Sequence, residues 1–349
     1  MTLKPEFSHR EAIDLLGLSA FAETDAPQPP IPDPRDMWDL VFDSPVMGPF
    51  DNKWQLWRKK GQGPFAIAIR GTVEEGGSSL EDLIALMVKA QGTLGICGVN
   101  HNYQFAADPR AGVHLGFALA TILLLNDPVN GIIARVGNQI PAGSDVYITG
   151  HSQGAAMATL LRSFFHYSGR LENCSIKTYV FAQPKPGNVH YAEDFESLFC
   201  DAAIAYRVTN TLDWVPEVPF TLQSPEDIDA PNPVTVYASP SLLMTLISKG
   251  VSDIRTLIEY HSRSHFQAMA VAVAQTHPAA AAAGGPSALN AVPFAADFIA
   301  SLDYVNAGTD FPLEGTPCVG AECHDSLFEH HATTYYALLR SLALASSEI

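Results

Sequence analysis

The sequence is poor in charge, and the charge it has is mostly negative. Only 16% of its 349 residues are charged, and 20 Lys and Arg stand against 37 Asp and Glu, which gives a formal net charge of −17. Phosphate backbones and anionic headgroups repel a chain of this sign, so we expect no nucleic-acid partner and no membrane surface held by charge alone. Hydrophobic contact with lipid stays compatible with the composition, because 47% of the residues are hydrophobic.

Cysteine is scarce as well. Five cysteines, an odd number, do not make the framework of a disulfide-rich domain. Cys318 and Cys323 leave two alternatives, a local bridge or a metal site shared with His324. A lone C-x4-C spacing is a weak metal signal, so we expect no metal centre.

Long apolar runs are missing too. The longest uncharged stretch, residues 264–296, is interrupted by His277, Pro278 and Gly284-Gly285 and is too polar for a membrane span. The first residues contain no apolar signal core. We therefore expect no transmembrane segment, and either a cytoplasmic location or export without a cleavable signal peptide.

The sequence does contain a strand, a sharp turn and a helix around one serine. Residues 145–149 are β-branched and aromatic, which favours a buried strand, and residues 155–165 have a helical pattern. Between them, Gly150-His151-Ser152-Gln153-Gly154 fits G-x-S-x-G. A nucleophilic serine at such a turn has strained backbone angles and needs small residues two positions to either side. A solvated surface turn has the same letters, but the flanking strand and helix favour Ser152 as a nucleophile.

Strands and helices alternate along the middle of the chain. A capping box formed by Ser8 and Glu11 predicts a helix over 9–22, and a Pro-rich connector follows at 27–34. Predicted strands cover 53–59, 65–70, 177–182 and 204–209, the first two as a hairpin, and an interrupted helical stretch covers 113–136. This alternation predicts an α/β protein with a mostly parallel central sheet and helices on both faces. Polar residues follow the strand ends, where such sheets place their sites.

We divide the chain into four parts. Residues 1–52 are predicted to form an N-terminal helix and a Pro-rich strap, and residues 53–224 the core. Residues 225–322 do not continue the strand–helix rhythm and predict a mainly helical insertion. An apolar insertion between two catalytic segments is well placed to cover a pocket, which favours a cap or lid over a surface elaboration. Residues 323–349 are predicted to return to the core and to contain the catalytic base, for which His330 and His331 are the candidates.

Several separate stretches resemble the class 3 lipase family, the α/β-hydrolases related to fungal triacylglycerol lipases. The matching pieces, in the family's order, are residues 69–72, 113–117, 150–154, 180–188, 206–210 and 213–216. The resemblance implies an α/β-hydrolase fold and a serine esterase activity. Gln153 stands where the family usually has Leu, Ile69 where Phe is common, and Pro186 replaces an apolar residue. None of these departures removes a reacting group.

The resemblance also implies a catalytic order of Ser, acid and His. Asp213 stands at the family's acid, although a loop aspartate capping its own turn is the alternative. The family's base often precedes a helix, with a Tyr five positions on. His330 with Tyr335 fits this spacing; His331 with Tyr336 fits it too but leaves the helix out of register, so we favour His330. The remaining candidates, each more often structural, are His261, His265, His277 and His324.

Two backbone donors complete the implied machinery. Thr72 resembles the family's oxyanion-hole residue, and Gln153, at the start of the helix after Ser152, gives the second N–H. The alternative for Thr72 is a threonine that caps its own loop. Arg70 and His114 are expected to be structural.

The sequence thus predicts a serine-dependent hydrolase of carboxylic esters, foremost acylglycerols, that works through an acyl-enzyme without cofactor or metal. A short-chain or aromatic carboxylesterase and a phospholipase use the same machinery and stay open as alternatives. A non-catalytic binding protein with a hydrolase fold is a further alternative, against which the complete Ser–Asp–His set speaks. The expected partners are a small-molecule ester or lipid and, transiently, a lipid interface.

Overall fold

A computed structural model of the chain describes residues 3–47, 51–71, 86–96, 99–223, 296–299, 301–317 and 325–346, with six single positions between 227 and 260. Its centre is a seven-stranded sheet, whose strands are, in spatial order, β1 (Trp38–Asp43), β2 (Trp54–Lys59), β3 (Phe65–Ile69), β8 (Asp145–His151), β9 (Ser175–Phe181), β11 (Ala205–Asn210) and β14 (Thr309–Leu313). The pairs β1–β2 and β2–β3 are antiparallel, and the other four are parallel. The sheet is therefore mostly parallel, with an antiparallel edge.

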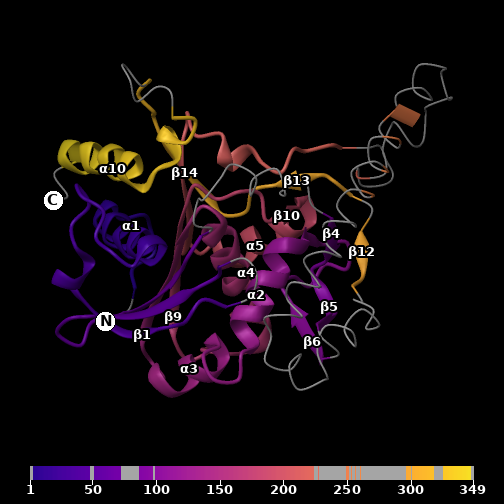
Figure 1. Ribbon diagram of the computed structural model, residues 1–349, viewed down its shortest axis with the longest axis horizontal. Helices are drawn as coiled ribbons and strands as arrows, with labels where there is room; N and C mark the ends of the chain where they lie inside the picture. Colours follow the sequence, from indigo (N-terminus) through magenta and orange to yellow (C-terminus); the bar gives the residue numbers. More distant parts are fainter. Residues whose placement is uncertain are drawn as a thin grey trace.

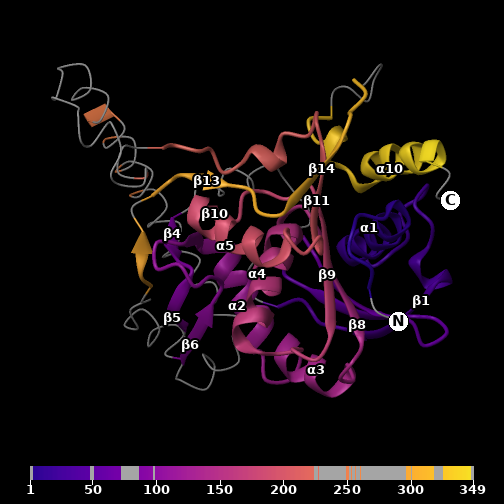
Figure 2. The same cartoon turned by 180° about the vertical axis from the view of Figure 1, so that it is seen from behind.

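Helices cover both faces of this sheet (Figures 1 and 2). On one face lie α1 (His9–Thr24) and α10 (Ala332–Ser346), and on the other α2 (Leu115–Asn126), α3 (Ile132–Gln139), α4 (Gln153–Ser168) and α5 (Val189–Phe199). The alternation of side chains along each strand supplies both cores. In β3, Ile67 and Ile69 join the larger core under α2 and α4, whereas Ala66 and Ala68 join the smaller core under α1 and α10. The small alanines let α1 approach the sheet closely.

Short strands form two further sheets beside the helices α2 and α5 (Figure 1). The first is antiparallel, with the order β12 (Phe298–Ile299), β4 (Met87–Lys89), β7 (Gly112–His114), β10 (Gly187–Asn188) and β13 (Tyr304–Val305). The second is the hairpin of β5 (Gln91–Ile96) and β6 (Val99–Gln104). Three single-turn 3₁₀ helices complete the described elements: η1 (Pro34–Asp36), η3 (Val215–Glu217) and η6 (Phe328–His330).

Most of the predicted elements are confirmed. Ser8 caps α1 by accepting a hydrogen bond from the Glu11 N–H, and β2 and β3 form the predicted hairpin. The helical stretch over 113–136 is divided into α2 and α3 by a turn at Asp127-Pro128, because the residue before a proline avoids the helical region.

Two predicted segments differ from the structure. Residues 298–299, 304–305 and 309–313 were expected in a mainly helical insertion, but they form β12, β13 and β14, and β14 is an edge strand of the central sheet. The N-terminal strap likewise contains β1, the opposite edge strand. Edge strands are half exposed and tolerate polar residues and Pro312, so neither has the apolar pattern that marks a buried strand. The remainder of 225–322, apart from short flanks and single positions, lies outside the described residues.

Two expectations on absences can be compared with the described part of the chain. Within it, no helix is long and apolar enough to cross a membrane, and no group of three or more His, Cys, Asp or Glu side chains is arranged to hold a metal ion. Cys318, Cys323 and His324 lie outside the described residues, so their two alternatives stay predictions.

Candidate active site

Ser152 stands at a strained turn between β8 and α4. Its backbone angles, φ 57° and ψ −133°, lie in a region that non-glycine residues rarely occupy. The turn is closed on both sides, since the Ser152 N–H donates to the Phe181 carbonyl (3.0 Å) and the Ser152 carbonyl accepts from the Ala155 N–H (2.9 Å). The geometry is that of the predicted nucleophile elbow.

The two glycines of the motif explain why the chain can turn there. A Cβ on Gly150 would collide with the Gly154 carbonyl, and a Cβ on Gly154 would collide with the Ile69 carbonyl of the neighbouring strand. Glycine is thus required two positions before and two positions after Ser152, because at both positions the backbones of the turn, the helix and the neighbouring strand are in direct contact.

The end of β3 runs beside the elbow. A Cβ on Gly71 would lie 3.4 Å from Ser152 Cβ and 2.9 Å from the His151 carbonyl, so the backbone of residue 71 is in contact with the turn. Thr72, the expected oxyanion-hole residue, follows directly but lies outside the described residues. Gln153 begins α4, where the first N–H groups have no partner within the helix.

Asp213 and His330 form a buried pair, although 117 positions separate them. His330 Nδ1 lies 2.9 Å from Asp213 Oδ2, and Asp213 Oδ1 accepts from the Val215 N–H at 3.0 Å. Both residues are about 95% buried. Burial alone would raise the pKa of the Asp213 carboxyl, but the hydrogen bonds from His330, Val215 and Tyr335 hold that pKa below its ordinary value. An ionised carboxylate only accepts, so Nδ1 of His330 carries the proton and, in the neutral ring, Nε2 is the free base.

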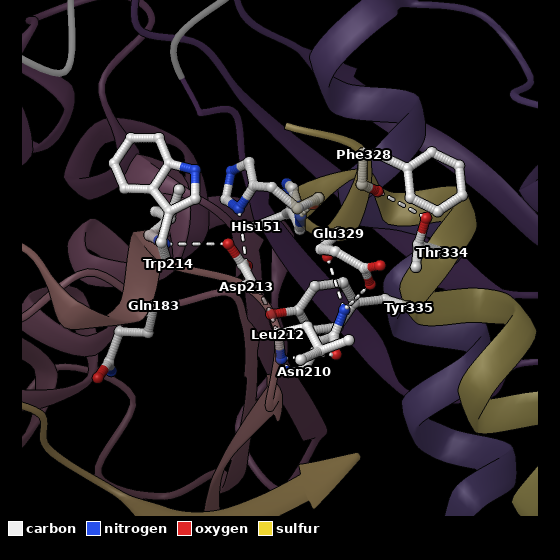
Figure 3. Close-up of polar contacts among 12 residues, drawn as sticks. His151, Gln183, Asn210, Leu212, Asp213, Trp214, Phe328, Glu329, Thr334 and Tyr335 are labelled. Atoms are coloured by element: carbon white, nitrogen blue, oxygen red, sulfur yellow. Dashed lines mark hydrogen bonds and ion pairs between the residues drawn. The ribbon is translucent and has the colours of Figure 1, made fainter. Parts of the chain in front are cut away.

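Tyr335 gives Asp213 a second donor. Its hydroxyl donates to Asp213 Oδ2 at 2.8 Å and accepts from the Asn210 N–H at 3.0 Å, and Figure 3 shows the ring of Tyr335 with its oxygen toward the carboxylate. Burial and the charge of Asp213 raise the pKa of Tyr335 well above its ordinary value, which keeps the hydroxyl protonated. The Asn210 amide also donates to the carbonyl and carboxylate of Glu329 (2.9 and 2.8 Å; Figure 3). We call the segment around Asn210 and Asp213 the acid loop and the turn that ends at His330 the base loop. Hydrogen bonds from Tyr335 to Asp213 and from Asn210 to Glu329 hold the acid loop against the base loop and the helix that follows it.

The elbow and the base loop meet through His151. Its Nε2 lies 2.8 Å from the His330 carbonyl, and the two imidazole rings are 4.7 Å apart between centroids. On its other side, His151 Nδ1 lies 2.6 Å from Glu23 Oε1 in the last turn of α1. Ser152, Asp213 and His330, predicted from the sequence, are thus gathered at one end of the sheet.

His331, the alternative base, is placed differently. Its side chain is 43% exposed, and its Nε2 pairs with Asp325 at 2.7 Å. Asp213, by contrast, pairs with His330. The competitors His261, His265, His277 and His324 lie outside the described residues. His114 caps α2 by accepting from the Phe117 N–H, which is the structural role expected for it.

Sequence reasoning missed two of these contacts. Tyr335 was used only for its distance of five positions from His330, because the sequence does not show which group its hydroxyl contacts. Glu23 was not considered, although an acid in the last turn of a helix opposes the helix dipole and so calls for a cationic partner elsewhere.

The comparison with protein families adds to this geometry. The family model described as "Lipase (class 3)" matches residues 66–223, a segment that includes the elbow and Asp213. Over these residues the chain is similar to the class 3 lipase family. His330 and α1 lie outside the matched segment.

Two curated relatives match part of this chain. A lipase from Caenorhabditis elegans, ZK262.3, is 33% identical over 75 residues, which is 22% of this chain and 20% of the relative. Phospholipase A1-II 1 from Oryza sativa subsp. indica is 32% identical over 93 residues, or 24% of this chain and 23% of the relative. The chain thus spans about a fifth to a quarter of the curated relatives it matches.

A solved structure extends the likeness to nearly the whole chain. The crystal structure of M37 lipase aligns with a TM-score of 0.53 at 19% identity and covers 97% of this chain and 95% of that one. At this identity the likeness concerns the fold alone. The fold is that of the α/β-hydrolases, as the resemblance implied.

Proposed function

We propose that this chain hydrolyses carboxylic esters of lipids, foremost acylglycerols, with Ser152, Asp213 and His330 as its catalytic groups. The observation that carries the proposal is the strained elbow of Ser152, joined through His151 to a base loop whose imidazole is held by a buried carboxylate. The similarity of residues 66–223 to the class 3 lipase family supports the same reaction class.

The proposed reaction has two steps. Ser152 Oγ attacks the ester carbonyl while His330 Nε2 takes its proton, and the imidazolium then protonates the leaving alcohol, which gives an acyl-enzyme. Water, deprotonated by the same nitrogen, attacks the acyl-enzyme, and the imidazolium protonates Ser152 Oγ as the bond to the acyl group breaks and the carboxylic acid leaves. Asp213 stabilises the imidazolium in both steps. We assign the developing oxyanion to the N–H groups of Gln153 and Thr72, each worth about 10²–10³ in rate.

A fluorophosphonate probe tests the nucleophile and base. We expect stoichiometric labelling of Ser152 in the wild type, none in Ser152→Ala, and a loss on the order of 10³–10⁶ in labelling rate in His330→Ala. His331→Ala is the matched control, one residue away, and should label at the wild-type rate because His331 pairs with an exposed acid. Wild-type protein that stays unlabelled would favour a binding protein with a hydrolase fold, and a label that survives Ser152→Ala would mean the wrong nucleophile.

A phospholipase is the second candidate, because one matched relative is named phospholipase A1. Release of fatty acid from emulsified triolein and from phosphatidylcholine vesicles, measured on one preparation, separates the two substrates. A series of nitrophenyl esters from acetate to palmitate separates both from a short-chain esterase, since activity confined to acetate would contradict a lipid substrate.

A further inference from the structure

A second acid–imidazole pair, Glu23 and His151, lies next to the pair of Asp213 and His330. Glu23, at the end of α1, contacts His151 Nδ1 at 2.6 Å, and the side chains of His151 and Glu23 are 4% and 20% exposed. Neither residue reacts in the mechanism above. The helix that carries Glu23 precedes the segment matched by the class 3 lipase family, so the contact comes from outside the matched domain.

The partners of His151 determine its protonation. A backbone carbonyl only accepts hydrogen bonds, so the Nε2 that faces the His330 carbonyl must carry a proton. Burial alone would raise the pKa of Glu23 and lower that of His151, but their mutual attraction outweighs burial, lowering the pKa of Glu23 and raising that of His151. An ionised Glu23 also accepts, so both ring nitrogens of His151 are donors and the ring is a cation.

The cationic ring holds the base loop. A charged N–H donor bonds a carbonyl about twice as strongly as a neutral one, and here the carbonyl belongs to His330 itself. Since His330 ends the single turn η6, the direction of its imidazole depends on how this short loop is fixed. The ring centroids of His151 and His330 are 4.7 Å apart, and His330 must become cationic during the proposed reaction. Glu23 neutralises the charge of His151 and so reduces the repulsion between the two rings.

We infer that Glu23 is a positioning residue for the hydrolase reaction. Acting through His151, it fixes the backbone of His330 and thereby aims the imidazole at Ser152. This inference rests on the proposed function. The N-terminal helix is then a part of the active site's support as well as a cover for one face of the sheet.

Charge removal on α1 tests the inference. Glu23→Gln keeps the shape of the side chain and removes its charge, and Glu23→Asp keeps the charge. The matched control is Glu11→Gln on the same helix, because Glu11 is similarly exposed (24%) and pairs with a buried cation, Lys177, away from the base loop. The readouts are kcat and KM for a nitrophenyl ester, the first-order rate of Ser152 labelling by excess fluorophosphonate, and the Tm. All rates are measured well below the Tm of every variant, where the folded fraction is close to one, so that the labelling rate reports the site and not the stability.

The expected result separates position from stability. Glu23→Gln should lower kcat and the labelling rate by about 10- to 100-fold, the cost of a misplaced catalytic group, with KM within about twofold of wild type. Glu23→Asp should lie between Glu23→Gln and wild type. Glu11→Gln should lower the Tm and leave the labelling rate unchanged.

Three outcomes would overturn the inference: wild-type rates in Glu23→Gln, equal losses in Glu11→Gln and Glu23→Gln, or a Glu23→Asp variant as slow as Glu23→Gln. Each assumes that wild-type protein is labelled at Ser152. Absence of that label would instead remove the proposed function itself.

Discussion

At the scale of single residues, the site is a set of buried polar groups that satisfy one another. Asp213 receives three donors, from His330, Val215 and Tyr335, and these keep it ionised despite its burial. Because a carboxylate in an apolar core would otherwise take up a proton, the donors are a condition of its use as the acid partner.

Tyr335→Phe tests how much one of these donors contributes. The change removes the donor to Asp213 and leaves the buried Asn210 N–H without its acceptor, which costs about 1–3 kcal/mol. We expect a fall of that size in the free energy of unfolding, measured with urea, and a fall in kcat as the carboxylate loses support. Tyr336→Phe is the control, since no hydrogen bond of the Tyr336 hydroxyl is found among the described residues, although the ring is buried. Equal effects of the two changes would contradict the role assigned to Tyr335.

At the scale of elements, two of the proposed catalytic groups follow the ends of parallel strands. Ser152 follows β8 and Asp213 follows β11, and carboxyl ends of parallel strands meet at one edge of a sheet. β8 is buried along its whole length and β11 over most of it, so their pattern was strong enough to predict both strands from the sequence. The short strands β4, β7, β10 and β13 were missed because two or three residues carry no periodic signal.

The pairing of distant loops shows where sequence reasoning ends. His330 and Tyr335 could be ranked as candidates by spacing, but their contacts with Asp213 and Asn210 cross more than 110 positions, and only the packing of α10 beside the sheet produces them. Glu23 is a stronger case, because its contact with His151 depends on the path of α1 across the same face of the sheet. A pattern within one segment contains no information on such contacts.

The loop after β11 presents apolar side chains beside Asp213. Leu212, Trp214 and Phe220 are 43%, 38% and 78% exposed. With a net charge of −17, the chain cannot rely on charge to reach an anionic surface, so we expect this loop to make the hydrophobic contact with lipid. Phe220→Ser should lower the rate on emulsified triglyceride several-fold, since full burial of a Phe ring is worth about 1.5–3 kcal/mol.

The control for this prediction uses an exposed residue at the other end of the sheet. Val129, 62% exposed, lies in the turn between α2 and α3, and α3 lies at the opposite end of the sheet from α10 (Figures 1 and 2). Val129→Ser should leave the emulsion rate unchanged, and both variants should keep the wild-type rate on a soluble short-chain nitrophenyl ester. A loss for Phe220→Ser on the soluble ester as well would point to a role in the pocket and not at the interface.

At the scale of the whole molecule, both ends of the described chain close over one face of the sheet. α1 and α10 pack together there, and the smaller core beneath them contains side chains from β3, β8, β9 and β11 (Figure 2). Glu23 from α1 and His330 from the turn before α10 meet at His151, so the packing of both terminal helices and the position of the His330 loop depend on the same contacts. Stability and activity should therefore respond together when this junction titrates.

The pH dependence of stability gives a test of that coupling. The pKa of Glu23 is below its ordinary 4.5 in the folded state, so its contribution to stability is present above pH 4.5 and is lost as the pH falls through the folded pKa. The pKa of His151 is above its ordinary 6.5, so its contribution is complete below pH 6.5 and is lost as the pH rises through the folded pKa. The Tm difference between wild type and Glu23→Gln should therefore be largest between about pH 4.5 and 6.5 and shrink on both sides. Asp213 and His330, the other ionisable groups beside His151, are common to both proteins and cancel in the difference. A difference that stays constant from pH 4 to pH 9 would mean that the two side chains do not form an ion pair in the folded protein.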